Sequence, residues 1–149
     1  MSYASVFDIA GMGMNAQSVR LNTVASNLAN AQSAASSVNN VYRARHPVFA
    51  AVQKSALDAA AGWPGEAPTA GEEGAGVQVL GIVESQAPLE RHYEPGHPLA
   101  DKDGYVLYPN VNVVEEMADM MSASRSFQIN VEMLQSAKSM AQRLLSLGQ

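Results

Sequence analysis

Three histidines are the residues best suited to bind a metal ion. His92 and His97 lie close to Glu90 and Glu94, and His46 stands apart from them. Imidazole and carboxylate groups are common metal ligands, but they bind only when the chain brings them together. A Pro-Gly pair separates His92 from His97, so no helix can align the two rings. We therefore predict no metal site and no cofactor.

Acidic residues give two further candidates for chemistry. The segment 101–104, Asp-Lys-Asp-Gly, resembles the opening of a calcium loop. It lacks the third acid and the bidentate Glu at the twelfth position, so we predict a turn there. Glu72 and Glu73 lie in a Gly-rich stretch, where nothing would desolvate them and shift their pKa values.

Composition excludes several classes of activity. The 149 residues include no Cys, which rules out thiol catalysis, disulfides and Cys-ligated zinc. No phosphate-binding loop, dinucleotide fingerprint or nucleophile elbow occurs in the sequence. The net charge of −5 argues against a nucleic-acid partner. The sequence predicts that the protein is not an enzyme.

The sequence also shows no recognisable signal peptide or membrane-spanning segment. Residues 1–15 hold no Lys or Arg and no unbroken apolar run, so we expect no cleaved signal peptide. No window approaches the ~18 apolar residues that a membrane span needs, so we expect no direct membrane insertion.

The first 36 residues predict a long helix. Large apolar residues recur every seven positions, and smaller ones follow three of them by three positions, as in a coiled coil. These rows are Phe7, Met14, Leu21 and Leu28, with Ala10, Val24 and Ala31. The other faces are polar but carry only Asp8 and Arg20, which favours burial among other subunits.

The last 40 residues repeat this design. The rows are Val113, Met120, Phe127, Leu134 and Ala141, with Met117, Val131 and Leu145. Asn112 is suited to cap the helix, and Glu115 stands at the spacing of a capping box. The Met cluster Met117, Met120 and Met121 fits either a helix core or an adaptable contact surface.

The middle of the chain has a different period. Residues 42–52, 77–84 and 104–108 predict strands, and residues 57–76, rich in Gly, Pro and Glu, predict a flexible loop. We therefore predict an α+β fold with two parts. Residues 1–36 and 110–149 form a discontinuous helical domain of coiled-coil type, and residues 37–109 form a small β-rich domain. That insert is too small to cover both helices, which must pair with each other and with other copies.

At this point the sequence resembles a known family. Residues 15–31, NAQSVRLNTVASNLANA, are similar to the N-terminal signature of flagellar rod, hook and hook-associated proteins. Residues 93–101, 104–106, 108–117, 122–128 and 145–149 resemble the proximal rod branch of that family, as do residues 42–45 and 83–88. The resemblance covers nearly the whole chain.

The resemblance implies a structural subunit of the bacterial flagellar basal body. Such a subunit polymerises helically in the periplasm as part of the drive shaft that transmits motor torque for motility. The implied partners are copies of itself, other rod proteins, rod-base and MS-ring adaptor proteins, and the type III export apparatus, which needs no cleaved signal.

We predict that the assembly interface follows the helical rows, with Asn27 and Asn30 making hydrogen bonds between subunits. The predicted residues are Phe7, Met14, Leu21, Val24, Asn27, Leu28, Asn30, Val113, Met117, Met120, Phe127, Val131, Leu134 and Leu145.

Two alternatives to a rod subunit are a secreted coiled-coil effector or chaperone-like binding module, and a small hydrolase with an unrecognised site. A binding module should form a small defined oligomer, whereas head-to-tail contacts give an open array.

Overall fold

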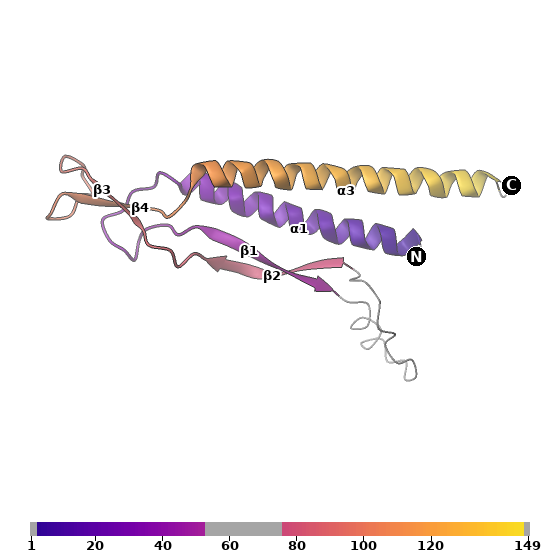
Figure 1. The fold of residues 1–149 in the computed structure, drawn as a ribbon, viewed down its shortest axis with the longest axis horizontal. Coiled ribbons are helices and arrows are strands. Elements are labelled where there is room, and N and C mark those ends of the chain that lie inside the picture. The colour runs from indigo at the N-terminus through magenta and orange to yellow at the C-terminus, as the bar shows by residue number, and fades with distance from the viewer. Residues whose placement is uncertain (1–2, 53–75, 148–149) are drawn as a thin grey trace, which may run out of the picture. The chain divides into compact units, whose positions relative to one another are not determined.

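The fold is α+β, as predicted. The computed structural model describes residues 3–52 and 76–147. Its elements, in chain order, are α1 (Tyr3–Asn30), β1 (Arg45–Val52), β2 (Gly76–Glu84), β3 (Glu90–Tyr93), β4 (Tyr105–Tyr108) and α3 (Val113–Leu147) (Figure 1). The loop predicted over residues 57–76 lies outside the described residues except for Gly76, which begins β2.

Helix α1 ends at Asn30, six residues before the predicted limit. The Asn30 side chain donates to the Ser26 carbonyl at 2.8 Å. The Asn30 carbonyl accepts from the Ser33 amide at 3.0 Å and from the Ser33 hydroxyl at 2.7 Å. These local bonds satisfy backbone groups that a continuing helix would otherwise have paired. Ala31, predicted as a member of the helical row, therefore lies beyond the helix.

Helix α3 begins with the predicted cap. The Asn112 side-chain oxygen accepts from the amides of Val114 at 3.1 Å and Glu115 at 3.4 Å. Glu115 and Glu116 occupy the first turn, where the helix dipole favours negative charge. The 35 residues of α3 give a helix about 50 Å long at the usual rise per residue.

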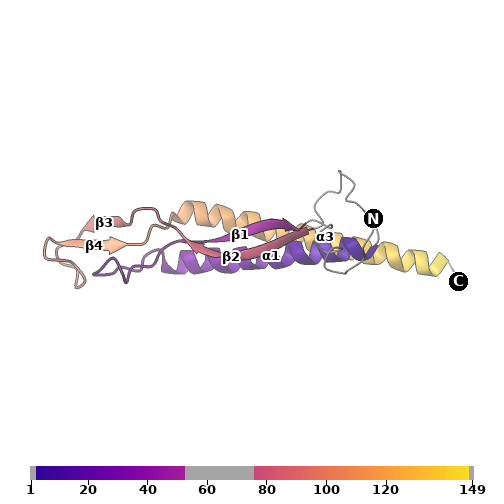
Figure 2. The same cartoon turned by 90° about the horizontal axis from the view of Figure 1, so that it is seen from below.

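The strands form two separate pairs, β1 with β2 and β3 with β4 (Figure 2). The three predicted strands correspond to β1, β2 and β4. Strand β3, Glu-Arg-His-Tyr, is exposed throughout and has no apolar alternation, so the sequence did not predict it. It forms by antiparallel pairing with β4, in which Tyr93 lies opposite Tyr105 with ring centroids 5.3 Å apart.

The turn predicted at residues 101–104 leads into β4. The Asp101 carboxylate accepts from the amide of Asp103 at 2.7 Å, so it supports the turn. Gly104 has a φ of 80°, a left-handed conformation that side chains disfavour. A Cβ at Gly104 would lie 3.0 Å from the Tyr93 ring. Both backbone strain and lack of space therefore select glycine here.

The chain divides into two compact units, and each contains part of both terminal helices. The first comprises Met1–Val19, Phe49–Leu80 and Ser124–Gln149. In it Gly13 of α1 lies against Asn130 of α3, and Gly76 of β2 lies against Met12. Its buried residues include Ala10, Ala16 and Ala137.

The second unit comprises Arg20–Val48 and Gly81–Ala123. Hydrogen bonds from α1 to α3 join its helical parts, and Val24, Val106 and Ala123 are among its buried residues. The two terminal helices thus pack together within each unit. The predicted division into a helical domain and a β-rich domain of residues 37–109 stays a prediction. Neither described helix is both long and apolar enough to cross a membrane.

Candidate assembly interface

The surface where α1 and α3 meet is built from small and polar residues. On α3 one row recurs every seven residues and contains three buried residues, Glu116, Ala123 and Ala137, with the half-buried Asn130 between the last two. On α1, Gly13 in the first unit and Asn27 in the second lie against this row, and Arg20 contacts Asp119 beside it. Small residues let two helix backbones approach closely, and the polar ones then need partners.

Asn27 has a partner for every hydrogen-bonding group of its side chain. The side chain is fully buried, and its amide donates to Glu116 Oε1 and to the Arg45 carbonyl, both at 2.8 Å. Its oxygen accepts from the Tyr42 hydroxyl and the Arg45 amide, both at 2.9 Å. We call these four residues, Asn27, Tyr42, Arg45 and Glu116, the Asn27 cluster. It leaves Asn27 without a free group for the predicted bond between subunits.

Glu116 is a buried acid with an incomplete set of partners. It is 5 % exposed, and its Oε2 atom is buried without a hydrogen bond. Burial raises the pKa of the Glu116 carboxyl above its ordinary value, while the hydrogen bond from Asn27 and the charge of His46 act in the opposite direction. Maintaining a buried carboxylate costs stability, so a specific role is needed to explain it.

A second polar contact lies in the same unit. The Arg20 guanidinium donates to Asp119 Oδ1 at 2.7 Å, and both side chains are partly exposed. Arg20 is the only cation in the first 36 residues, so the sequence offers no other basic partner for Asp119 from that helix. Partly exposed pairs contribute little stability, but a short one still restricts how the helices align.

The predicted large apolar rows flank this contact surface instead of forming its centre. In the described residues, Met14, Leu21, Leu28, Asn30, Val113, Met120, Phe127, Val131 and Leu134 are half-buried, and Val24 is buried. Phe7 and Met117 are 36 % and 49 % exposed, and the Leu145 side chain lies outside the described residues. The expected helix pairing is confirmed, but its most buried residues are smaller than those predicted.

Helix α3 also presents exposed apolar side chains, and all of them except Met121 were missed in the sequence. In the first unit these are Ile129, Met133, Met140 and Leu144, and in the second Val114 and Met121, all between 47 % and 77 % exposed. Met133 and Met140 are themselves seven residues apart, a signal that could have identified this face. Met117 and Met121 of the Met cluster fall on the surface, while Met120 is half-buried.

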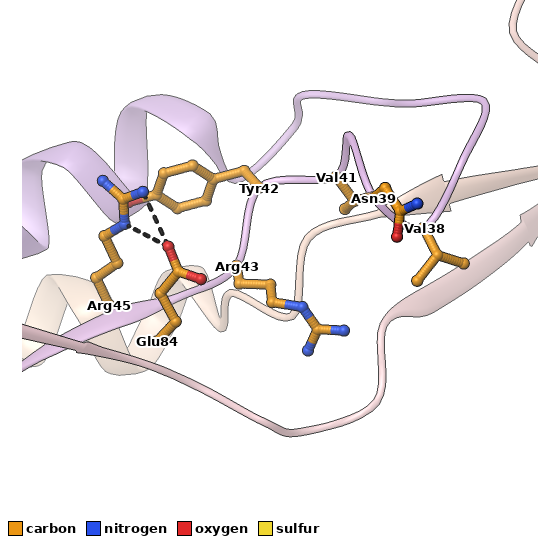
Figure 3. Close-up of a pocket in the computed structure, with 7 residues that line it drawn as sticks. All are labelled: Val38, Asn39, Val41, Tyr42, Arg43, Arg45 and Glu84. Atoms are coloured by element: carbon orange, nitrogen blue, oxygen red, sulfur yellow. Dashed lines mark hydrogen bonds and ion pairs between the residues drawn. The ribbon is translucent and has the colours of Figure 1, made fainter.

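An open depression of about 410 Å³ lies in the second unit (Figure 3). Among the residues that line it, Arg45 contacts Glu84 through two nitrogens at 3.0 and 3.2 Å. Arg43 donates to the carbonyls of Ser85 and Ala87. These side chains hold neighbouring segments together, and the lining includes no nucleophile paired with a base.

The histidines considered as metal ligands make separate local contacts. His92 lies edge-on to the Tyr108 ring at 5.0 Å, and His97 Nδ1 accepts from the Leu99 amide at 3.1 Å. Across residues 3–52 and 76–147, no three His, Cys, Asp or Glu side chains are grouped so that they could hold a metal ion.

Paired terminal helices with a long exposed apolar face are typical of a protein that assembles with other subunits. Residues 7–32 match the family described as flagella basal body rod protein, and residues 102–147 match the C-terminal family of flagellar basal body rod FlgEFG proteins.

Full-length relatives agree with these matches. The chain is 50 % identical over 149 residues to the flagellar basal-body rod protein FlgC of Salmonella typhimurium, with all of both chains covered. It is 49 % identical to FlgC of Escherichia coli O157:H7, again with full coverage of both. It is 35 % identical to FlgC of Borreliella burgdorferi, covering 100 % of this chain and 99 % of that protein.

The chain belongs to the family of flagellar basal-body rod proteins. It is a structural subunit of the rod and not an enzyme. The resemblance found in the sequence is thereby confirmed, and the hydrolase and effector alternatives are set aside.

Proposed function

We propose that this subunit polymerises helically with other rod proteins in the proximal rod and transmits motor torque. The observation that carries the proposal is the apolar surface of α3. Met133, Met140 and Leu144 are 47–53 % exposed, and residues 3–52 and 76–147 leave them uncovered to that extent. Rows of exposed large apolar residues mark interaction surfaces. Contacts that join different faces of successive copies give an open helical array.

The interface is built on the rows that flank the helix contact. They comprise Phe7, Met14, Leu21 and Leu28 on α1, with Asn30 at its end, and Val113, Met117, Met120, Phe127, Val131, Leu134 and Leu145 on α3. Their partial exposure supports this assignment where the side chains are described, because such residues can contact their own chain and a neighbour together. Val24 and Asn27 support the interface from inside the chain.

We infer the export route and the neighbouring proteins from membership of the family. The subunit leaves the cytoplasm through the type III export apparatus and assembles in the periplasm. There it contacts copies of itself, other rod proteins and the rod-base and MS-ring adaptor proteins. The family matches at both ends of the chain support this assignment.

A charge at the middle of the α3 row tests the proposal. Phe127→Asp places a carboxylate in a surface that assembly would bury, which should cost several kcal/mol per contact. We expect normal synthesis, no basal-body rods by electron microscopy and no spreading in motility agar. Gln128→Asp, at the next and exposed position, is the matched control and should swim.

The helix content of purified Phe127→Asp separates a folding defect from an assembly defect. Swimming of Phe127→Asp at the wild-type rate would remove Phe127 from the interface.

A further inference from the structure

We propose that the Asn27 cluster selects the register in which the two terminal helices pair. Asn27 and Glu116 are both buried and bonded to each other at 2.8 Å, whereas the other polar residues of this contact surface, Arg20 and Asn130, are only partly buried. The cluster therefore acts by positioning the helices. The register belongs to the single chain, so a failure of polymerisation would leave it untouched.

The apolar rows alone leave the register ambiguous. Both helices carry rows that repeat every seven residues, so a shift of α3 by seven residues places similar side chains against α1. The small residues of the contact surface also repeat, since Ala123 and Ala137 stand seven residues on either side of Asn130. Packing volume therefore distinguishes these registers weakly.

The polar groups distinguish them strongly. A shift by seven residues brings Ala123 to the place of Glu116, opposite Asn27. The Asn27 amide would then face a methyl group, and Glu116 would lose its one donor to Oε1. Buried polar groups without partners are costly, and a single polar residue in a helix interface is known to fix register at a cost in stability.

The same amide also fixes the start of β1. Asn27 bonds both the amide and the carbonyl of Arg45, as a neighbouring strand would, and accepts from Tyr42. These three bonds do not involve α3, so they hold the Asn27 side chain in place, and Glu116 is its partner on α3. One side chain thus joins α1, α3 and the segment that leads into β1.

The Arg20–Asp119 pair agrees with this register. Arg20 lies seven residues before Asn27, and its partner Asp119 lies three residues after Glu116, so the two pairs run in opposite directions along the helices, as antiparallel packing requires. The offsets of seven and three residues are unequal, and the long Arg20 side chain spans the remaining distance. Both groups are partly exposed, so water can replace their contact. The fully buried Asn27 therefore carries most of the discrimination.

Cysteine cross-linking tests the proposal directly, because the chain contains no Cys. Gly13→Cys with Asn130→Cys reports the observed register, since these two positions are in contact. Gly13→Cys with Ala123→Cys or with Ala137→Cys reports the two shifted registers. The purified full-length chain is oxidised mildly at low concentration, and only cross-links within the monomer band are scored.

In the parent we expect the 13–130 cross-link alone. In Asn27→Leu, which keeps a side chain of similar size, the ratio of the 13–130 product to a shifted product should fall about tenfold or more, as loss of a buried polar partner implies. Asn22→Leu, at an exposed position of the same helix, is the control and should behave as the parent.

Three results would overturn the proposal. They are an unchanged product ratio in Asn27→Leu, equal cross-linking of observed and shifted pairs in the parent, and absence of the 13–130 product from the parent. If Asn27→Leu loses its helical circular dichroism signal, Glu116→Leu removes the other end of the bond and decides the question by the same ratio.

Discussion

Two glycines of α1 provide a matched test of how closely the helices approach. Gly11 and Gly13 lie two residues apart in the same helix. A Cβ added at Gly11 meets nothing within 4 Å, whereas a Cβ added at Gly13 lies 2.9 Å from Asn130 Nδ2 and 3.3 Å from Asn130 Cγ. The substitution Gly→Ala should therefore stabilise the chain more at Gly11 than at Gly13.

The expected magnitudes follow from helix propensity and packing. Alanine inside a helix is more favourable than glycine by roughly 0.5–1 kcal/mol, so Gly11→Ala should raise the free energy of unfolding by about that amount. At Gly13 the same gain is opposed by displacement of the Asn130 amide. Because this amide is the end of a flexible, half-buried side chain, the cost should lie at the low end of the ~1–3 kcal/mol that overpacking typically costs. The propensity gain is common to both sites, so we expect Gly13→Ala to be less stable than Gly11→Ala by the displacement cost alone, about 1 kcal/mol.

Urea unfolding followed by far-ultraviolet circular dichroism measures this difference in the purified chain. The double variant Gly13→Ala with Asn130→Ala should recover stability relative to the sum of the single changes, because the contact is removed from both sides. If Gly13→Ala stabilises the chain as much as Gly11→Ala, the close approach of Gly13 to Asn130 is refuted.

Three further predictions concern other parts of the chain. Burial raises the pKa of Glu116, so its folded carboxyl holds a proton more tightly than the unfolded one, and its contribution to stability should fall as pH rises from about 4.5 through the folded pKa. Glu116→Gln should flatten that part of the stability–pH curve in urea titrations, and an unchanged slope would contradict the assignment. Gly104→Ala should lower the free energy of unfolding by about 1–3 kcal/mol because of its positive φ, whereas Gly96→Ala, with open space around it, should change it little. Equal thermal shifts for these two variants would count against the strained turn. Deletion of residues 65–74, which carry no packed apolar pattern in the sequence, should leave basal bodies intact. Electron micrographs without rods in that strain would instead make the segment a contact.

The sequence predicted the main helices and strands because local signals are strong in them. The cap at Asn112 needs only a side-chain oxygen close to free amides, and the structure has that bond. The turn before Tyr105 similarly depends on Asp101 and Gly104, whose properties are local. Strand β3 could not be predicted in this way, since its residues become a strand only through their partners in β4.

The burial of the helices was decided by the tertiary structure. Seven-residue rows reveal which faces of α1 and α3 are apolar, but not which face each helix turns toward the other. The observed contact selects Gly13, Ala123 and Ala137 because small residues permit close approach, and it leaves larger side chains such as Phe127 at the flanks.

The sequence by itself therefore determined the family, the two long helices and the absence of catalytic motifs, all of which depend on residues close together in the chain. Only the tertiary structure showed that Asn27 is an internal residue. Its partners Tyr42, Arg45 and Glu116 come from segments up to 89 positions away. A hydrogen bond over such a separation leaves no periodic signal in a single sequence, because it exists only after the segments have packed together.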